Sequence, residues 1–303
     1  MRSLKESIRT IIIKLSNTAL LKWVPDAIYL KWLFWARMER KLNLKNPVSF
    51  NEKLQWLKLN DRSPQYTTMV DKHLVKRYVS DLCGQDYVIP LLGVWNDFDE
   101  IDFDSLPNQF VLKCTHDSAG LIICRDKKTL NIEAARQKIK RSMKKNYYWH
   151  AREWPYKNVK PRILAEKYIH DDSQGDNDNL IVYKIFNFEG APTLIQVITN
   201  DKSENESIDY FDTNWSLLDL RQNFPNSKRH LNKPSKLEEM LELSRKLSAG
   251  FHFLRVDFYE VGEQVLFSEF TFFSDAGVER FYPEEWDFRL GKLIDLSTDY
   301  ESK

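Results

Sequence analysis

The sequence has few cysteines and no long apolar run, and both scarcities exclude classes of protein. Its three cysteines, Cys83, Cys114 and Cys124, are an odd number without the spacing of a metal site, which indicates a reducing compartment and hence the cytoplasm. No stretch of about 18 apolar residues is present, so we expect no segment that spans a bilayer. Lys14 interrupts the short apolar run 11–13 and no small-residue cleavage site follows, so we expect no signal peptide.

An excess of charge of one sign is missing as well. The 45 Lys and Arg residues nearly balance the 44 Asp and Glu residues, and the net charge of +1 gives no argument for nucleic-acid binding by the whole molecule. Apolar residues make up 42% and charged residues 29%, as in globular chains. Glycine is scarce at nine residues, and we find neither an internal repeat nor a low-complexity tract. The 303 residues suit two or three packed subdomains.

Residues 1–46 differ in composition from the rest, because they carry ten Lys and Arg residues against three Asp and Glu residues, a local charge of +7. Apolar residues recur there at helical spacing, at Ile8, Ile11, Ile12, Leu15 and Ala19. This spacing predicts a basic amphipathic helix, and a second apolar and aromatic stretch covers residues 28–35. Two interpretations stay open: both helices pack on the body of the protein, or they hold it reversibly on an anionic membrane surface through residues 1–40.

Helix signals continue along the rest of the chain. Capping boxes at 49–52 and 235–238 each predict the start of a helix. A further helix is expected over 67–81, a basic helix over 131–146 and a last helix after Pro283, a residue that suits the first helical turn.

Strands dominate after residue 110. They are expected at 88–94, 110–114, 120–124, 163–166, 181–186, 193–198, 253–260 and 265–273. The polar segment 171–179 is expected to be an exposed turn. Strands and helices do not alternate regularly, which predicts an α+β fold.

The last two strands form a candidate metal hairpin. A turn centred on residue 263 puts Asp257 directly opposite Glu269, and alternation puts Arg255 and Thr271 on the same face. Two facing carboxylates repel each other, and a divalent cation such as Mg²⁺, which prefers oxygen ligands, removes that cost. The alternative is a solvent-exposed acidic pair with Arg255 as its counter-ion.

A polar loop with a glycine follows the strand at 110–114. Lys113 stands near the end of that strand, and the loop occupies residues 116–120. Such a loop can direct backbone N–H groups and hydroxyls at phosphates while the lysine supplies positive charge. It is not a P-loop, because the Walker pattern is absent.

A charged pair, Glu166 and Lys167, ends the strand at 163–166. Taken alone, this pair is equally typical of a strand that meets solvent. The order of the motifs adds to it: a strand with a lysine and a polar loop, a Glu-Lys hinge, an Arg-x-Asp strand and a Glu-x-Thr strand. This order resembles the ATP-grasp superfamily, and the Arg-x-Asp segment looks like the metal strand of D-alanine–D-alanine ligases.

More closely, the chain resembles the TupA-like (teichuronopeptide-biosynthesis) ATP-grasp family of bacterial surface-polysaccharide loci. The segments that carry the resemblance are 49–58 (SFNEKLQWLK), 89–95 (IPLLGVW), 110–114 (FVLKC), 153–157 (EWPYK), 269–273 (EFTFF) and 283–286 (PEEW). It implies an ATP-grasp fold, in which two α+β subdomains clasp ATP, with a helical N-terminal extension. The boundaries that we expect are 1–46 for the extension, 47–108 for an N-terminal α/β subdomain, 109–168 for subdomain A with the phosphate loop, and 169–303 for subdomain B with the metal hairpin.

The resemblance implies roles at the phosphates. Lys113 would contact the ATP phosphates, and Ser118 and Gly120 would lie in the loop that folds over them. Lys184, on the next strand, would be a second phosphate ligand. The loop departs from the family's His-Gly-Ser-Gly-Gly pattern, since Asp117 replaces its first glycine.

The resemblance also implies roles at the base and the metal. Glu166 would meet the adenine amino group, Lys167 would line that cleft and Ile169 would offer its backbone to the purine. Asp257 and Glu269 would hold Mg²⁺.

Three further residues complete the implied site. Thr271 stands where many ATP-grasp enzymes have a metal-binding Asn, and its hydroxyl would bind a metal-bound water. Arg255 would stabilise the tetrahedral state or the acyl phosphate. His116 would assist proton transfer, with the ordinary structural role of a lone histidine as the alternative.

The activity that the resemblance implies is an ATP-dependent carboxylate–amine ligase of capsule or O-antigen biosynthesis, with ATP and Mg²⁺ as cofactors. It would join an amino acid to a uronic acid or an amino sugar through an acyl phosphate. Lysines, an arginine and Mg²⁺ suffice for this chemistry, which fits the lack of a Cys–His or Ser–His–Asp signature. Two alternatives stay open: a glycosyltransferase or other sugar-modifying transferase of the same pathway, and a non-catalytic membrane-associated scaffold.

The partners that we expect are an amino acid and a saccharide, lipid-linked saccharides included, and no nucleic acid. Specificity is expected to lie in the loops 146–160 and 199–232, which are rich in Tyr, Trp, Arg and Asn. We expect a cytoplasmic protein, and the two interpretations of residues 1–40 leave open whether it is free or held peripherally at the inner face of the cytoplasmic membrane.

Overall fold

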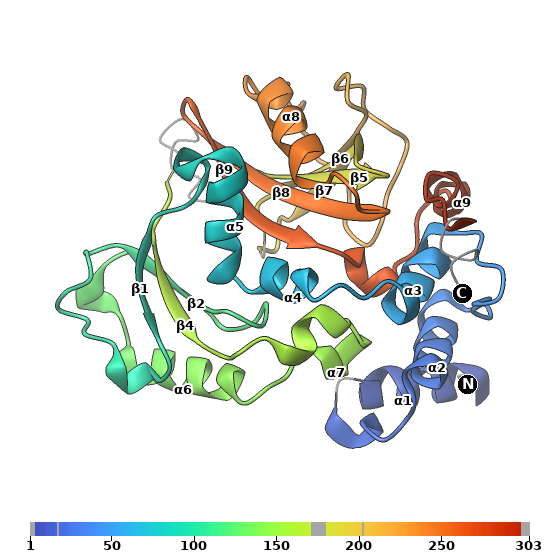
Figure 1. Cartoon of the computed structure of the whole chain (residues 1–303), viewed down its shortest axis with the longest axis horizontal. Coiled ribbons are helices and arrows are strands. Elements are labelled where there is room, and N and C mark those ends of the chain that lie inside the picture. Colours follow the sequence, from blue (N-terminus) through green and yellow to red (C-terminus); the bar gives the residue numbers. More distant parts are fainter. Residues whose placement is uncertain (1–3, 17, 171–179, 202, 298–303) are drawn as a thin grey trace.

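The computed structural model describes residues 4–16, 18–170, 180–201 and 203–297, so the turn expected at 171–179 lies outside the described residues. Two antiparallel sheets, of four and five strands, form the body of the protein (Figure 1). Helix α6 packs on the smaller sheet and helix α8 on the larger one, while α1, α2, α3 and α9 gather at one end (Figure 1). The expected α+β layout is confirmed.

The four-stranded sheet has the order β1-β4-β2-β3 and a hydrophobic core of its own. Its strands are β1 (Leu91–Trp95), β2 (Phe110–Cys114), β3 (Leu121–Cys124) and β4 (Ile163–Lys167). Alternation along β2 turns Phe110, Leu112 and Cys114 inward, where all three are fully buried beneath α6 (Ile132–Met143). Val111 and Lys113 therefore point to the opposite face, away from this core.

The five-stranded sheet has the order β7-β6-β5-β8-β9 and belongs to a larger, separate core. Its strands are β5 (Val182–Phe188), β6 (Ala191–Thr199), β7 (Ser207–Phe211), β8 (Phe253–Val261) and β9 (Gln264–Thr271). The helices that contribute to this core are α3 (Phe50–Asn60), α4 (Gln65–Val70), α5 (Leu74–Cys83), α8 (Leu237–Leu247) and α9 (Glu285–Gly291). The segment 47–108 thus contributes to both cores, through α3–α5 to the larger and through β1 to the smaller.

A β-bulge sets the register of the β8–β9 hairpin. Val261 pairs with Gln264, so the turn has two residues and is not centred on residue 263. That register alone would put Asp257 opposite Ser268. The pairing shifts by one residue past Ser268, so that Asp257 faces Glu269 as expected.

The N-terminal helices dock on the body through α2 (Asp26–Met38), whose Leu30 and Phe34 are fully buried in a third core. Arg152 fastens this group: its side chain is 1% exposed, donates to the carbonyl of Leu21 at 2.7 Å and lies over the ring of Tyr29. Helix α1 (Leu4–Ser16) packs on α2. Among the described residues, no helix combines the length and the apolar content that crossing a bilayer requires.

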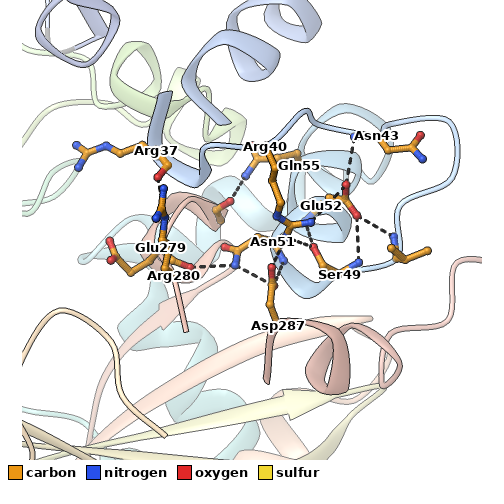
Figure 2. Close-up of polar contacts among 12 residues, drawn as sticks. Arg37, Arg40, Asn43, Ser49, Asn51, Glu52, Gln55, Glu279, Arg280 and Asp287 are labelled. Carbon is orange, nitrogen blue, oxygen red and sulfur yellow. Dashed lines mark hydrogen bonds and ion pairs between the residues drawn. The ribbon is translucent and has the colours of Figure 1, made fainter. Parts of the chain in front are cut away.

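A polar network joins α3 to α9 (Figure 2). The predicted capping box is present, because Ser49 accepts from the N–H of Glu52 and Glu52 accepts from the N–H of Ser49. Asp287, 1% exposed, accepts from the backbone and side-chain N–H groups of Asn51, both at 2.9 Å, and pairs with Arg40. The segments before α3 and after β9 are therefore held together by buried hydrogen bonds (Figure 2).

Two predictions about where helices begin and end are corrected by the structure. The expected helix 67–81 is two helices, because Asp71 accepts from the N–H groups that open α5 and pairs with Arg162 at 2.7 Å. The capping box at 235–238 is absent, since the Ser235 hydroxyl donates to Glu260 at 2.6 Å and α8 begins at Leu237 without a side-chain cap.

The other corrections concern one proline and one strand. The last helix begins at Glu285, so Pro283 precedes it instead of lying in its first turn. Strand β7 was not predicted from the sequence, although all five of its residues are buried beside β6.

We predict that Asp287→Ala lowers the free energy of unfolding by about 3 kcal/mol, because it removes the carboxylate that pairs with Arg40 and leaves the buried N–H of Asn51 without its acceptor. The urea midpoint at unchanged m-value measures this loss. Asp81→Ala is the control: it removes a pair with Arg77 whose side chains are 68% and 89% exposed, and should change stability by less than about 0.5 kcal/mol. Equal losses in both variants would contradict a fastening role for the network.

Candidate nucleotide and metal site

A cavity of about 590 Å³ lies between the two sheets and is lined by residues of both. The predicted site residues that line it are Lys113, Ser118, Gly120, Glu166, Lys167, Ile169, Lys184, Asp257 and Glu269. Three others, His116, Arg255 and Thr271, do not line it. Residues far apart in the sequence thus meet at one place because β2 and β4 of one sheet face β5, β8 and β9 of the other.

Glu166 lies between two lysines. Its carboxylate is 2.5 Å from Lys113 Nζ and 2.6 Å from Lys76 Nζ, and Glu166 is 5% exposed. Burial raises the pKa of Glu166, but the two ammonium groups outweigh burial and hold the pKa below its ordinary value. The strand end that could have met solvent is a buried charge cluster.

Asp257 is also buried and paired. It is 1% exposed and accepts two hydrogen bonds of 2.8 Å from Arg255, in the parallel arrangement that is strong for guanidinium and carboxylate. Lys184, its cross-strand neighbour on β5, has its ammonium 3.8 Å away. Burial raises the pKa of Asp257, and Arg255 and Lys184 oppose this rise. The counter-ion that we expected is present, but the aspartate is not exposed to solvent.

Glu269 faces Asp257 across the hairpin and has a more open side chain, 40% exposed. Burial raises its pKa, yet Lys72, Lys184, Arg255 and Lys113 outweigh this and leave the pKa lowered. The carboxylate is therefore ionised at neutral pH, as a metal ligand must be.

The residues present fit a magnesium ion that is bound together with nucleotide. Asp257 and Glu269 supply hard oxygen donors on adjacent strands, and each carboxylate oxygen of Asp257 keeps a lone pair beyond its bond to Arg255. No group of three or more His, Cys, Asp or Glu residues gathers to hold a metal in the part of the chain that the structure describes. Two carboxylates suit Mg²⁺, which takes one or two carboxylates together with phosphates and waters.

Asp117, which replaces the first glycine of the family's loop pattern, stabilises the fold of the loop. Its carboxylate accepts from the N–H of Gly120 at 3.0 Å and from the hydroxyl of Ser142, and it is 5% exposed. Lys72 donates to the carbonyl of Asp117 at 2.8 Å. The carboxylate that replaces the family's glycine is therefore occupied by hydrogen bonds that stabilise the conformation of the loop.

Gly120 is required by close packing. A Cβ at this position would lie 2.4 Å from the sulfur and 2.7 Å from the Cβ of Cys114, and 2.8 Å from the hydroxyl oxygen of Ser142. The carbonyl of Gly120 accepts from the N–H of Cys114 at 2.7 Å, which closes the loop. No side chain fits here unless the loop shifts.

His116 and Thr271 have other surroundings. His116 is 2% exposed, and its Nε2 donates to the carbonyl of Ser142 at 3.2 Å, so it packs beneath the loop. Thr271 pairs with Arg255 at the end of the hairpin. Neither residue borders the cavity.

Sequence reasoning missed two lysines of the cleft. Lys72 precedes α5 and lines the cavity, and Lys76 lies one turn further and contacts Glu166. Their spacing of four residues beside the buried Val75 and Val79 could have shown that both face inward.

It also missed two buried ionisable groups, Glu153 and Lys58, that interact electrostatically. Glu153, 6% exposed, makes no hydrogen bond through its carboxylate to any residue that the structure describes. Burial raises the pKa of Glu153 to about 7. The negative charges of Asp275 and Glu269 add to this rise, and the positive charges of Lys58 and Arg255 oppose it. Burial lowers the pKa of Lys58 to about 8, and its ammonium donates to the carbonyls of Ala151 and Ala276 at 2.9 and 2.8 Å.

A family model for TupA-like ATP-grasp proteins matches residues 52–295 of the chain. The chain belongs to the TupA-like ATP-grasp family. This confirms the resemblance seen in the sequence, and the two sheets around the cavity are those of the ATP-grasp fold. Family and fold support an ATP-dependent ligase that uses ATP and Mg²⁺. No curated protein matches the sequence significantly.

Solved structures similar to this TupA-like protein include ATP-grasp ligases. The D-alanine–D-alanine ligase from Helicobacter pylori is 16% identical with a TM-score of 0.43, over 82% of this chain and 70% of that one. The corresponding ligase from Bacillus anthracis, complexed with ATP, is 14% identical with a TM-score of 0.45, over 78% and 69%. The ATP-grasp ligase PsnB, complexed with a minimal precursor, is 10% identical with a TM-score of 0.40; the match covers 69% of this chain and about half, 54%, of that one.

We predict that Gly120→Ala weakens Mg²⁺-ATP binding by at least about tenfold, because the loop must move away from Cys114 to admit a methyl group. Isothermal titration calorimetry with the folded variant measures this. Gly250→Ala is the control: its added Cβ meets no atom within 4 Å, so it should leave the affinity for ATP unchanged even though the positive φ of +83° strains it. Unaltered binding by Gly120→Ala would show that the loop does not touch the nucleotide.

Proposed function

We propose that this protein is a carboxylate–amine ligase of capsule or O-antigen biosynthesis, which forms an amide between an amino acid and a uronic acid or amino sugar. One observation carries the proposal: Asp257 and Glu269 face each other at the same cavity as Lys113 and Lys184. Carboxylates for a metal and ammonium groups for phosphates are thereby brought together from both sheets. The motif segments shared with the surface-polysaccharide family support the substrate class.

The chemistry would take place in two steps. A carboxylate oxygen of the first substrate attacks the γ-phosphorus of ATP, the bond to the bridging oxygen breaks, and ADP leaves. The amine of the second substrate then attacks the acyl carbon, its nitrogen loses a proton, and phosphate leaves. Mg²⁺, when bound, neutralises charge on the β- and γ-phosphates.

The chain's own residues would orient the substrates and neutralise their negative charge. Lys113 and Lys184 approach the cavity from opposite sheets and would bind phosphate oxygens, Lys113 by exchanging Glu166 for the nucleotide. Ser118 and the backbone of Gly120 would close over the same phosphates. Arg255, fixed by Asp257 and 3.2 Å from the Ser274 hydroxyl, would oppose the negative charge of the tetrahedral state.

Glu153 would accept the proton of the amine. Its carboxylate makes no hydrogen bond to the described residues and does not line the cavity, so the proton would reach it through a bridging water. A pKa of about 7 suits a general base at neutral pH. The positive charge of Lys58 opposes the rise in the pKa of Glu153 and so favours its ionised form.

The first experiment mixes purified protein with Mg²⁺-ATP and pairs of amino acids with uronic acids or amino sugars, and measures ADP release. We expect release with at least one pair and a loss of about 100-fold or more in Asp257→Asn. Glu263→Gln, in the turn of the same hairpin and 89% exposed, should keep full activity. If no pair releases ADP and calorimetry shows binding of a nucleotide sugar but not of ATP, the protein is a transferase instead.

With an active pair in hand, we predict that Glu153→Gln slows amide formation by about 10²-fold or more. In the native enzyme, kcat/KM for the amine should rise with pH through about 7, because the carboxylate must lose its proton before it can accept one. The variant should lose this rise while it still forms the acyl phosphate, which hydroxylamine traps as a hydroxamate. A variant that retains the native pH profile would exclude Glu153 as the base.

A further inference from the structure

Seven large apolar side chains are exposed on the N-terminal helices and the connector between them. They are Leu4, Ile8 and Ile11 on α1, Leu20 and Trp23 in the connector, and Ile28 and Trp32 on α2. Leu4 and Trp23 are each 78% exposed, and Ile11 is 54% exposed. We call these seven residues the N-terminal apolar surface. Scattered single apolar residues are ordinary on a protein surface, whereas seven within 29 residues of one helical group are not.

The spacing shows that the apolar side chains form stripes. Leu4, Ile8 and Ile11 recur at intervals of four and three residues, so they lie along one side of α1. Ile28 and Trp32 are four residues apart on α2, whose opposite side is buried in the core of the helical group. The inner side of α2 thus forms the core of the helical group. The apolar stripes on the outer sides take no part in that core.

Positive charge borders these stripes. At 3.6 residues per turn, Lys5 and Lys14 fall on either side of the stripe on α1, and Lys31 is adjacent to Trp32 on α2. Lys5, Lys14 and Lys31 are exposed and form no ion pair with the described residues. Aromatic and aliphatic residues bordered by lysines are the composition of surfaces that lie in the headgroup region of a bilayer.

The acidic residues nearby are already neutralised. Glu39 pairs with Arg9 and with Arg280, the latter at 2.8 Å. Asp26 accepts from the hydroxyl of Tyr148 at 2.7 Å and pairs with Arg152 at 3.3 Å. Lys5, Lys14 and Lys31 therefore stay available to an anionic partner, whereas Arg40 is paired with Asp287.

Polar contacts join the helices that carry this surface to the body of the protein. Arg280 donates to the carbonyl of Arg37 at the end of α2, at 3.2 Å, and Arg40 pairs with Asp287 (Figure 2). The residues that follow the metal hairpin thus hold the helices that carry the apolar surface. A partner bound there would take up a fixed orientation relative to the cleft.

We propose that the N-terminal apolar surface docks this protein on an anionic lipid bilayer, with Trp23 and Trp32 at the headgroup level and the lysines on lipid phosphates. This goes beyond the ligase activity and does not depend on it. The charge favours a bilayer over a second copy of the chain, because two copies would bring two sets of unpaired lysines together.

The test is co-sedimentation of the purified full-length chain with vesicles of phosphatidylglycerol and phosphatidylcholine in equal parts, and with vesicles of phosphatidylcholine alone. We expect binding to the anionic vesicles that falls as salt rises, and much weaker binding to the neutral ones. Ile11→Ser with Trp23→Ser, and separately Lys14→Glu with Lys31→Glu, should each weaken binding at least tenfold. Leu217→Ser, which alters an apolar residue that is 63% exposed outside the N-terminal segment, should leave it unchanged.

The outcomes separate the occupants of this surface. No sedimentation with anionic vesicles at low salt overturns the proposal, and so does equal loss in the Leu217→Ser control. A concentration-dependent dimer in light scattering that the Ile11→Ser/Trp23→Ser variant abolishes, without vesicle binding by the native chain, assigns the surface to a second copy and also overturns it. ADP release measured in solution on the Ile11→Ser/Trp23→Ser and Lys14→Glu/Lys31→Glu variants should stay unchanged, which keeps this test separate from that of the ligase.

Discussion

The buried pair of Arg255 and Asp257 is the interaction on which the cleft depends. Asp257 has almost no solvent to hydrate it, so without the guanidinium it would be protonated or displaced. The same guanidinium lies 3.8 Å from Glu269, which allows two carboxylates to face each other on adjacent strands. Lys184, on the same sheet, adds a positive charge beside Asp257, and Lys113 supplies one from the opposite wall. The cleft is lined by ion pairs between carboxylates and cationic side chains. An anionic nucleotide and a divalent cation can bind there by replacing one partner of such a pair.

Two separate cores make such an arrangement practicable. The smaller sheet is stabilised with α6 and the larger with α3–α5 and α8, so each wall of the cleft is supported from its own side. The charged residues then lie on the faces turned away from those cores, as the alternation in β2 and β8 requires. The phosphate loop joins the two parts: Lys72 from the larger body contacts the backbone of Asp117.

The sequence predicted the hairpin and its facing carboxylates because alternation in a strand is a strong local signal. It missed the bulge at Ser268, since no residue pattern there distinguishes a two-residue turn with a bulge from a longer turn. It missed Lys76 because lysines on a helix usually face solvent, and the burial of Lys76 beside Glu166 depends on the packing of a distant strand. The role of Asp117 could not be predicted either, because its partner Ser142 lies on α6 and is distant in the sequence.

The position of the metal tests this account most directly. A crystal structure with Mn²⁺ and a non-hydrolysable ATP analogue would locate the ion by its anomalous scattering. We predict an ion coordinated by oxygens of both Asp257 and Glu269 and by the phosphates. An ion bound to phosphates alone, with Asp257 still engaged by Arg255 and Glu269 turned to solvent, would contradict it.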